Sequence, residues 1–129
     1  MYIHLNLSSG APIYGQIVDQ IKYMVVSRAL VGDDKLPSIR QLASDLSINP
    51  TTVVKAYDEL EHAGIIYRRR GQGCFINTQV PSITRKERSR LVGEHTRSLA
   101  VEGLRLGLSS QEILSALEEE LNNIEEKRK

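Results

Sequence analysis

The stretch LPSIRQLASDLSINPTTVVKAYDELEHAGIIYRRRGQGCFI, residues 36–76, decides the fold. It opens with a helix start signal, because Ser38 can cap the free N–H groups of a first turn and Gln41 stands where a capping box places its second member. Apolar residues follow at helical spacing, at Ile39, Leu42, Ala43 and Leu46. This pattern predicts a short helix with one apolar face.

A second helix is expected directly after a tight corner. Asn49 is a good N-cap residue, Pro50 suits the first helical position, and Gly64 suits the C-terminal stop. The inward residues are expected to be Val53, Ala56, Tyr57 and Leu60. Two short helices with single apolar faces pack across one another, which leaves the start of the second helix free to project outward.

The period changes beyond Gly64. Residues 65–68 and 74–77 are strand-like, and two glycines lie in Arg69–Gly73 between them. This predicts a β-hairpin with a flexible, positively charged tip. A helix-turn-helix followed by a basic hairpin suits double-stranded DNA, because a helix fits the major groove and its N-terminal residues reach base edges first.

The blocks LPSIRQLASDL, NPTTVVKAYDELEHAGII and RRRGQGCFI resemble the winged helix-turn-helix domain of the GntR family of bacterial transcription regulators. The flanking segments narrow the resemblance to the short-tailed YtrA-type subfamily, and it covers nearly the whole chain. The resemblance implies a mainly α fold with a small β-hairpin, followed by a C-terminal two-helix dimerisation appendage. We expect the winged-helix domain over residues 1–78 and the linker and helical tail over residues 79–129.

The predicted DNA contacts fall in three groups. Ser38 and Arg40, at a helix N-terminus that favours anions, form a phosphate clamp; in the GntR family the arginine matching Arg40 contacts DNA. The start of the second helix contributes its exposed polar residues, and the hairpin tip is expected to enter the minor groove. The full predicted set is Ser38, Arg40, Asn49, Thr51, Thr52, Lys55, Arg68, Arg70, Gly71, Gln72 and Gly73.

Several of these residues could instead have no role in DNA binding. Thr51 and Thr52 could be ordinary residues of a first helical turn. Val54 could make an apolar contact with a base, or it could have no role in DNA recognition. At least one of Arg68 and Arg69 is expected to be merely solvated, and Lys35 is expected to lie in a polar loop, Gly32–Lys35. The family's fatty-acid-responsive members carry further arginines on the recognition helix. Pro50 and Val54 occupy those positions here, so that base-reading scheme does not carry over.

The N-terminal segment is expected to support this unit. Alternating apolar residues in Tyr2–Leu7 suggest a short edge strand, and a helix is expected from Pro12 to about Ala29. We expect Tyr14 to pack in the core or at an interface.

The residues after Thr84 predict two amphipathic helices. One should run to Leu106 and end at Gly107, and the next should begin at Ser109 with a capping box to Glu112. The predicted dimerisation residues are Leu91, Val92, Leu99, Leu106, Ile113, Leu117, Leu121 and Ile124. Residues 84–105 hold six Lys/Arg and three Glu, whereas residues 106–126 hold six Glu and no Lys or Arg. Such helices cannot bury both apolar stripes alone, so an antiparallel pair that meets a second copy is expected. A hairpin folding back on its own domain is the alternative.

Composition limits the other functions. The formal net charge is +1, and the three consecutive arginines matter more than the total. The one cysteine, Cys74, excludes an intrachain disulfide, and inert packing is favoured over oxidant sensing. Three scattered histidines offer no metal-ligand spacing, and no nucleophile elbow is present, so we expect neither an enzyme nor a cofactor. No membrane-spanning run or signal peptide is found, so a cytoplasmic protein is expected.

Together these patterns predict a sequence-specific regulator, and more specifically a repressor. It would bind an inverted-repeat DNA operator as a homodimer, with recognition helices in major grooves and basic wings in minor grooves. Any small-molecule effector would need a site at the dimer interface, where no residue cluster specifies one. The alternative from another class is a winged-helix protein–protein adaptor whose tail binds a partner helix.

Overall fold

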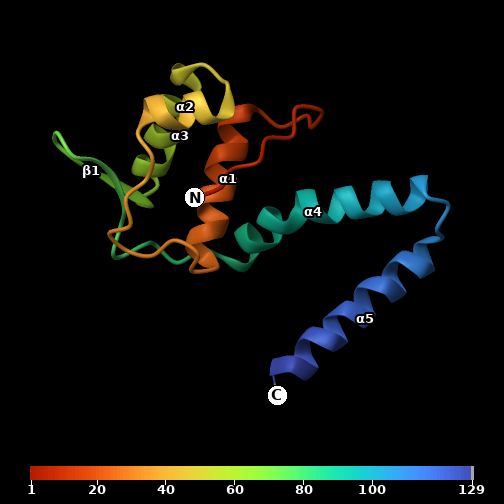
Figure 1. Cartoon of the computed structure of the whole chain (residues 1–129). Helices are drawn as coiled ribbons and strands as arrows, with labels where there is room; N and C mark the ends of the chain where they lie inside the picture. The colour runs from red at the N-terminus through yellow and green to blue at the C-terminus, as the bar shows by residue number, and fades with distance from the viewer. Residues whose placement is uncertain (129) are drawn as a thin grey trace. The chain divides into compact units, whose positions relative to one another are not determined.

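The computed structural model describes residues 1–128, which fold as two units, Met1–Thr84 and a second unit that begins at Arg85 (Figure 1). The first unit contains α1 (Ile13–Val26), α2 (Ile39–Leu46), α3 (Pro50–His62), β1 (Ile66–Arg69) and β2 (Gly73–Ile76). The second contains α4 (Arg85–Arg105) and α5 (Ser110–Arg128). The expected class, mainly helical with one hairpin, is confirmed.

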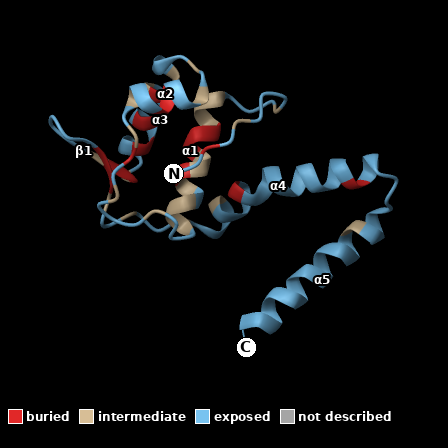
Figure 2. Cartoon of the chain, viewed as in Figure 1, coloured by how far each residue is buried: buried red, intermediate tan, exposed pale blue. Residues whose placement is uncertain are grey.

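The core of the first unit lies where α3 packs against both α1 and α2. The predicted stripe of α3 supplies its centre, because Val53, Ala56, Tyr57 and Leu60 are all fully buried. Ile17 and Ile21 of α1 are equally buried, and Figure 2 shows the buried stretches on these helices. The apolar faces derived from helical spacing therefore form one shared core, with α1 as the scaffold behind the helix-turn-helix.

Local hydrogen bonds fix the ends of α2 and α3. The Ser38 side chain accepts a hydrogen bond from the Gln41 backbone N–H at 3.1 Å. The Asn49 side chain accepts one from the Thr51 backbone N–H at 2.9 Å. The reciprocal half of the predicted capping box is wrong, because the Gln41 amide donates to Asp45 Oδ1 at 2.7 Å instead of turning back. Residues four apart are neighbours on a helix surface, so Asp45 is within reach of the Gln41 amide.

Gly64 ends α3 as predicted. Its φ is +78°, its N–H donates to the Glu61 carbonyl, and the Ile65 N–H donates to the Leu60 carbonyl. These two bonds make a Schellman motif, in which the left-handed residue is normally glycine. A Cβ at this position would also lie 3.3 Å from Pro81 Cγ, so the position is restricted by space as well as by its backbone.

The wing is the antiparallel hairpin β1–β2, with Ile66 opposite Ile76 and Arg69 opposite Gly73. Residues 33–36, which include most of the predicted polar loop Gly32–Lys35, add a third strand-like segment beside β2. Leu36 N–H donates to the Cys74 carbonyl at 2.9 Å, and Asp33 N–H donates to the Ile76 carbonyl at 2.8 Å. Polar composition concealed this pairing, because the bonds use backbone groups alone.

The expected strand over Tyr2–Leu7 is absent, and two glutamine side chains of α1 bind this segment instead. Gln20 accepts from the His4 N–H at 2.9 Å and donates to the His4 carbonyl at 2.6 Å. Gln16 makes the same pair of bonds with Asn6, at 2.8 and 3.0 Å. Two amides one helical turn apart thus replace a neighbouring strand, while Ile3 enters the core. The following helix, α1, ends at Val26, three residues before the expected Ala29.

The first unit includes residues that follow β2. Val80 packs on the core, and a Cβ at Gly32 would lie 2.9 Å from the Thr78 Cα. The division between the units falls after Thr84.

The second unit is a pair of helices joined by a turn. Gly107, with φ +83°, ends α4, and Ser109 and Glu112 form the predicted capping box with bonds of 3.0 and 3.1 Å. The helices touch near the turn, where a Cβ on Gly103 would approach Ile113 Cδ1 to 2.7 Å. Beyond that contact they diverge instead of packing side by side (Figure 1).

Candidate nucleic-acid interface

The start of α3 presents the residues expected to meet base edges. Thr51 and Lys55 are exposed and Thr52 is half-buried, while Val53 between them is fully buried. The Asn49 cap and Pro50 at the first position fix where the helix begins. The three side chains therefore project from a rigid first turn and a half whose opposite face is held in the core.

Lys55 has a partner that the sequence did not indicate. Its Nζ lies 4.0 Å from the centre of the Tyr14 ring, which α1 supplies. Such a cation–π contact leaves the ammonium charge intact and restricts its long stem. Tyr14 was expected only to pack, and nothing in the sequence indicated a pairing between residues forty-one positions apart.

The start of α2 carries the predicted phosphate clamp. Ser38 and Arg40 are both exposed, and the Arg40 side chain makes no hydrogen bond or ion pair with any residue from 1 to 128. The Ser38 hydroxyl already accepts from Gln41 N–H, but its own proton is free to be donated. A cation beside a helix N-terminus is a combination that attracts phosphate.

The three consecutive arginines of the wing differ in their surroundings. Arg68 Nη2 lies 2.5 Å from Asp58 Oδ1, and its Nε lies 3.6 Å from Glu61 Oε2. Arg69 lies 4.5 Å from the centre of the Phe75 ring and 3.7 Å from Asp33 Oδ1. Arg68, predicted as a DNA contact, thus already faces two carboxylates.

Arg70 is the wing arginine without a partner among the described residues. It lies in the turn with Gly71, whose φ is +74°, and Gln72, whose N–H donates to the Arg69 carbonyl at 2.9 Å. Gly73 follows at φ +109° and closes the last pair of the ladder with Arg69. The tip is therefore exposed, narrow and singly charged.

Three contacts tie the clamp, the recognition helix and the wing to one another. The Tyr57 hydroxyl donates to the Pro37 carbonyl at 2.7 Å and joins α3 to the start of α2. The Leu36–Cys74 backbone bond joins the start of α2 to the wing, and Arg68–Asp58 joins the wing to α3. The three predicted contact groups are thus parts of one closed frame.

Other chemistry finds little support in the described part of the chain. Burial raises the pKa of the Cys74 thiol, which disfavours the reactive thiolate and agrees with inert packing. No group of three or more His, Cys, Asp or Glu side chains among residues 1–128 could hold a metal ion. No helix in the same range combines the length and apolarity that a bilayer crossing requires.

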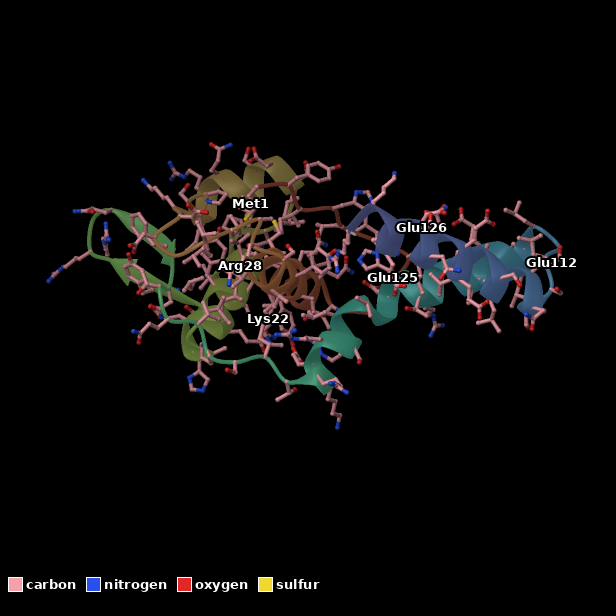
Figure 3. All side chains as sticks on the ribbon, turned by 90° about the horizontal axis from the view of Figure 1, so that it is seen from below. Met1, Lys22, Arg28, Glu112, Glu125 and Glu126 are labelled. Carbon is pink, nitrogen blue, oxygen red and sulfur yellow. The ribbon has the colours of Figure 1, made fainter. Side chains whose placement is uncertain are left out.

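The predicted dimerisation residues are mostly uncovered in the single chain. Val92, Leu99, Leu117, Leu121 and Ile124 are each 42–50% exposed, and Leu106 is 76% exposed. Ile113 is half-buried against Gly103, and Leu91 is already buried. Figure 2 shows α5 exposed almost throughout, and Figure 3 shows Glu112, Glu125 and Glu126 along it.

Comparison with known proteins gives a consistent result. Residues 13–76 match the family model described as bacterial regulatory proteins, gntR family. The HTH-type transcriptional regulator YhcF of Bacillus subtilis is 38% identical over 87% of this chain and 92% of its own length. The HTH-type transcriptional repressor YtrA of the same organism is 33% identical over 86% and 85%. The structure of YtrA from Sulfolobus acidocaldarius, a GntR-family transcription factor, superposes with a TM-score of 0.55 at 30% identity, over 95% and 99% of the two chains.

The matches extend past the helix-turn-helix into the short helical tail, and the fold and exposed basic groups agree with them. The chain belongs to the GntR family of DNA-binding transcription regulators and has the short tail of its YtrA type.

Proposed function

We propose that the protein represses transcription as a homodimer bound to an inverted-repeat operator. The observation that carries this proposal is the closed frame described above, which holds a cationic clamp, a helix N-terminus and a wing together in the first unit. A relative at 33% identity, YtrA of Bacillus subtilis, is named as a repressor, which supports the direction of regulation. Repression would follow from occupation of the promoter.

Sequence would be read mainly by α3 in the major groove. Thr51 and Thr52 can donate to phosphate or to a base acceptor, and either methyl group can meet a thymine methyl. Lys55, steadied over Tyr14, can reach a guanine edge or a phosphate. Asn49 caps this helix and thereby sets its approach to the groove.

The clamp and the wing would fix the position of α3. Ser38 and Arg40 contact one phosphate, which orients the helix without reading bases. Arg70 enters the minor groove with Gly71, Gln72 and Gly73 as its narrow support. Readout there is limited to A·T against G·C and to groove width.

The second subunit would be recruited by the tail. Val92 and Leu99 on α4, Leu106 in the turn after it, and Leu117, Leu121 and Ile124 on α5 leave an apolar surface that one chain does not cover. The basic α4 and the acidic α5 favour a second copy as the partner, because opposite charges then meet across a two-fold axis. Dimerisation doubles the few base contacts that one subunit offers.

The salt dependence of binding tests the contact assignments. Arg40→Ala and Arg70→Ala should each weaken binding to a duplex that the wild type selects from a random pool. Each should also flatten the plot of log affinity against log salt by about one unit per lost phosphate contact. Lys127→Ala in the last turn of α5 removes one positive charge outside the first unit and outside the basic α4, and should leave the slope unchanged. An unchanged slope for Arg40→Ala or Arg70→Ala would overturn that residue's assignment.

A further inference from the structure

The two arginines of β1 point to opposite sides of the wing. Arg68 meets Asp58 and Glu61, which lie three residues apart on α3, at 2.5 and 3.6 Å. Arg69 lies over Phe75 and beside Asp33 on the other side. Alternation along a strand explains the opposite directions. Each face of β1 is thus attached to a different neighbour, and Arg70 lies just beyond the last residue pair.

Asp58 occupies a position where a carboxylate should be unfavourable for DNA binding. It lies three residues after Lys55, so it shares that side of α3 and would repel nearby phosphates. Glu59, its neighbour, makes no ion pair with any other residue of the described chain. Unlike Glu59, Asp58 contacts the wing through Arg68.

We propose that Asp58, supported by Glu61, is a positioning residue that sets the angle of the wing relative to the recognition helix through Arg68. This inference rests on the proposed function and deepens it, because it makes minor-groove contact by Arg70 depend on an acidic residue of α3. Arg68 then acts as the link between the two groove-binding elements, and its role is separate from that of Arg70.

Backbone hydrogen bonds from segment 33–36 hold the β2 side of the wing, whereas the link through Arg68 holds the β1 side. The two strands of the wing have four residues each, and two glycines with positive φ lie near its tip, Gly71 in the turn at +74° and Gly73 at the start of β2 at +109°. Glycine restricts the backbone least, and an isolated two-stranded hairpin is only marginally stable. A short hairpin of this kind is only marginally rigid by itself. A charge-assisted hydrogen bond at 2.5 Å from Arg68, which lies one residue pair before the turn end of the ladder, ties β1 to α3.

A double-mutant cycle tests the proposal. The penalty of Arg70→Ala is measured on a duplex selected by the wild type from a random pool, in three backgrounds: wild type, Asp58→Asn and Glu59→Gln. We expect about a tenfold loss of affinity in the wild type and in Glu59→Gln, but about threefold or less in Asp58→Asn. Asp58→Asn and Glu59→Gln remove the same charge from adjacent positions, so non-specific attraction changes equally in both.

A second variant protects the test against misfolding. Arg68→Gln breaks the same link from the other side and changes the net charge in the opposite direction, yet it should reduce the Arg70→Ala penalty in the same way. An equal Arg70→Ala penalty in the wild type and in either link variant would overturn the proposal. No Arg70→Ala penalty in the wild type would overturn the wing contact of the proposed function, and this inference with it.

Discussion

Tyr57 shows how one side chain can connect the core to the interface. It is fully buried in the stripe of α3, and its hydroxyl leaves the core to reach the Pro37 carbonyl at 2.7 Å, directly before the Ser38 cap. Burial raises the pKa of Tyr57, so the phenol stays protonated and remains a donor. The proposed clamp at the start of α2 thus depends on a residue of α3.

Tyr57→Phe should destabilise the first unit by about 1–2 kcal/mol at pH 7, because the Pro37 carbonyl loses its donor. The folded pKa of Tyr57 is raised, so its contribution to stability is complete below the unfolded value of about 10 and falls as pH rises beyond it. The gap between wild type and Tyr57→Phe should therefore narrow above about pH 10. Urea unfolding of both proteins at pH 7 and above about pH 10 measures this difference in stability. A difference that is constant with pH would contradict the role of the Tyr57 hydroxyl as a donor.

Sequence predicted the residues whose partners lie within one turn. Ser38, Asn49 and the Ser109–Glu112 pair cap their helices as expected, because a cap bonds to a neighbour fixed by the backbone. The link between Arg68 and Asp58 was not predicted, since ten residues and a change from helix to strand separate them. The three consecutive arginines indicated a positive charge on the wing, but not which of them would have no hydrogen-bond or ion-pair partner.

At the scale of elements, the corner between α2 and α3 stores conformational strain. Ser47 has φ +55°, a left-handed conformation that L-residues adopt at a cost, and the Ile48 N–H donates to the Ala43 carbonyl across it. Its side chain is exposed and makes no hydrogen bond with another described residue. The corner determines how α3 departs from α2.

Ser47→Gly should raise stability by about 0.5–1 kcal/mol, because glycine adopts this conformation without the Cβ penalty. Ser44→Gly is the matched control, since Ser44 is an exposed residue inside α2 and the same change there should cost about 0.5–1 kcal/mol. Thermal unfolding of the two variants should give shifts of opposite sign. A lower melting temperature for Ser47→Gly would show that the corner is not strained.

The elements themselves were predictable to within a few residues wherever a period was sustained. The helices of the first unit and the hairpin follow from spacing of 3.6 and 2. The expected strand at Tyr2–Leu7 was wrong. Its alternation arose because Ile3 enters the core, and its backbone is bound by two glutamine side chains of α1 instead of by a neighbouring strand. Segment 33–36 was missed for the converse reason, as backbone pairing leaves no trace in side-chain type.

At the scale of the whole molecule, the proposed dimer depends on the tail. Leu121 lies on the apolar face of α5 at 50% exposure, and Glu120 beside it belongs to the charged face. Leu121→Gln should shift the monomer–dimer equilibrium toward monomer, because it removes apolar area from the proposed interface. Glu120→Gln introduces the same residue next to it and should leave the equilibrium nearly unchanged. Sedimentation over a range of concentrations measures both, and equal effects would argue against this face.

Sequence also limited what could be said about the tail. Heptad spacing and the opposite charges of residues 84–105 and 106–126 indicated two helices whose apolar faces need a partner surface. The close contact of Gly103 with Ile113, and the divergence beyond it, depend on packing that no periodic pattern encodes. The small residue at the crossing was visible in the sequence but had no assigned partner.

Selection of bound sequences from a pool of random duplex DNA by the full-length chain tests the central claim most directly. The account predicts an enriched inverted repeat, with two equivalent half-sites for two recognition helices and a preference for A·T pairs or narrow minor groove beside each half-site. A single asymmetric site, bound equally well by a chain ending at Thr84, would contradict dimeric operator binding.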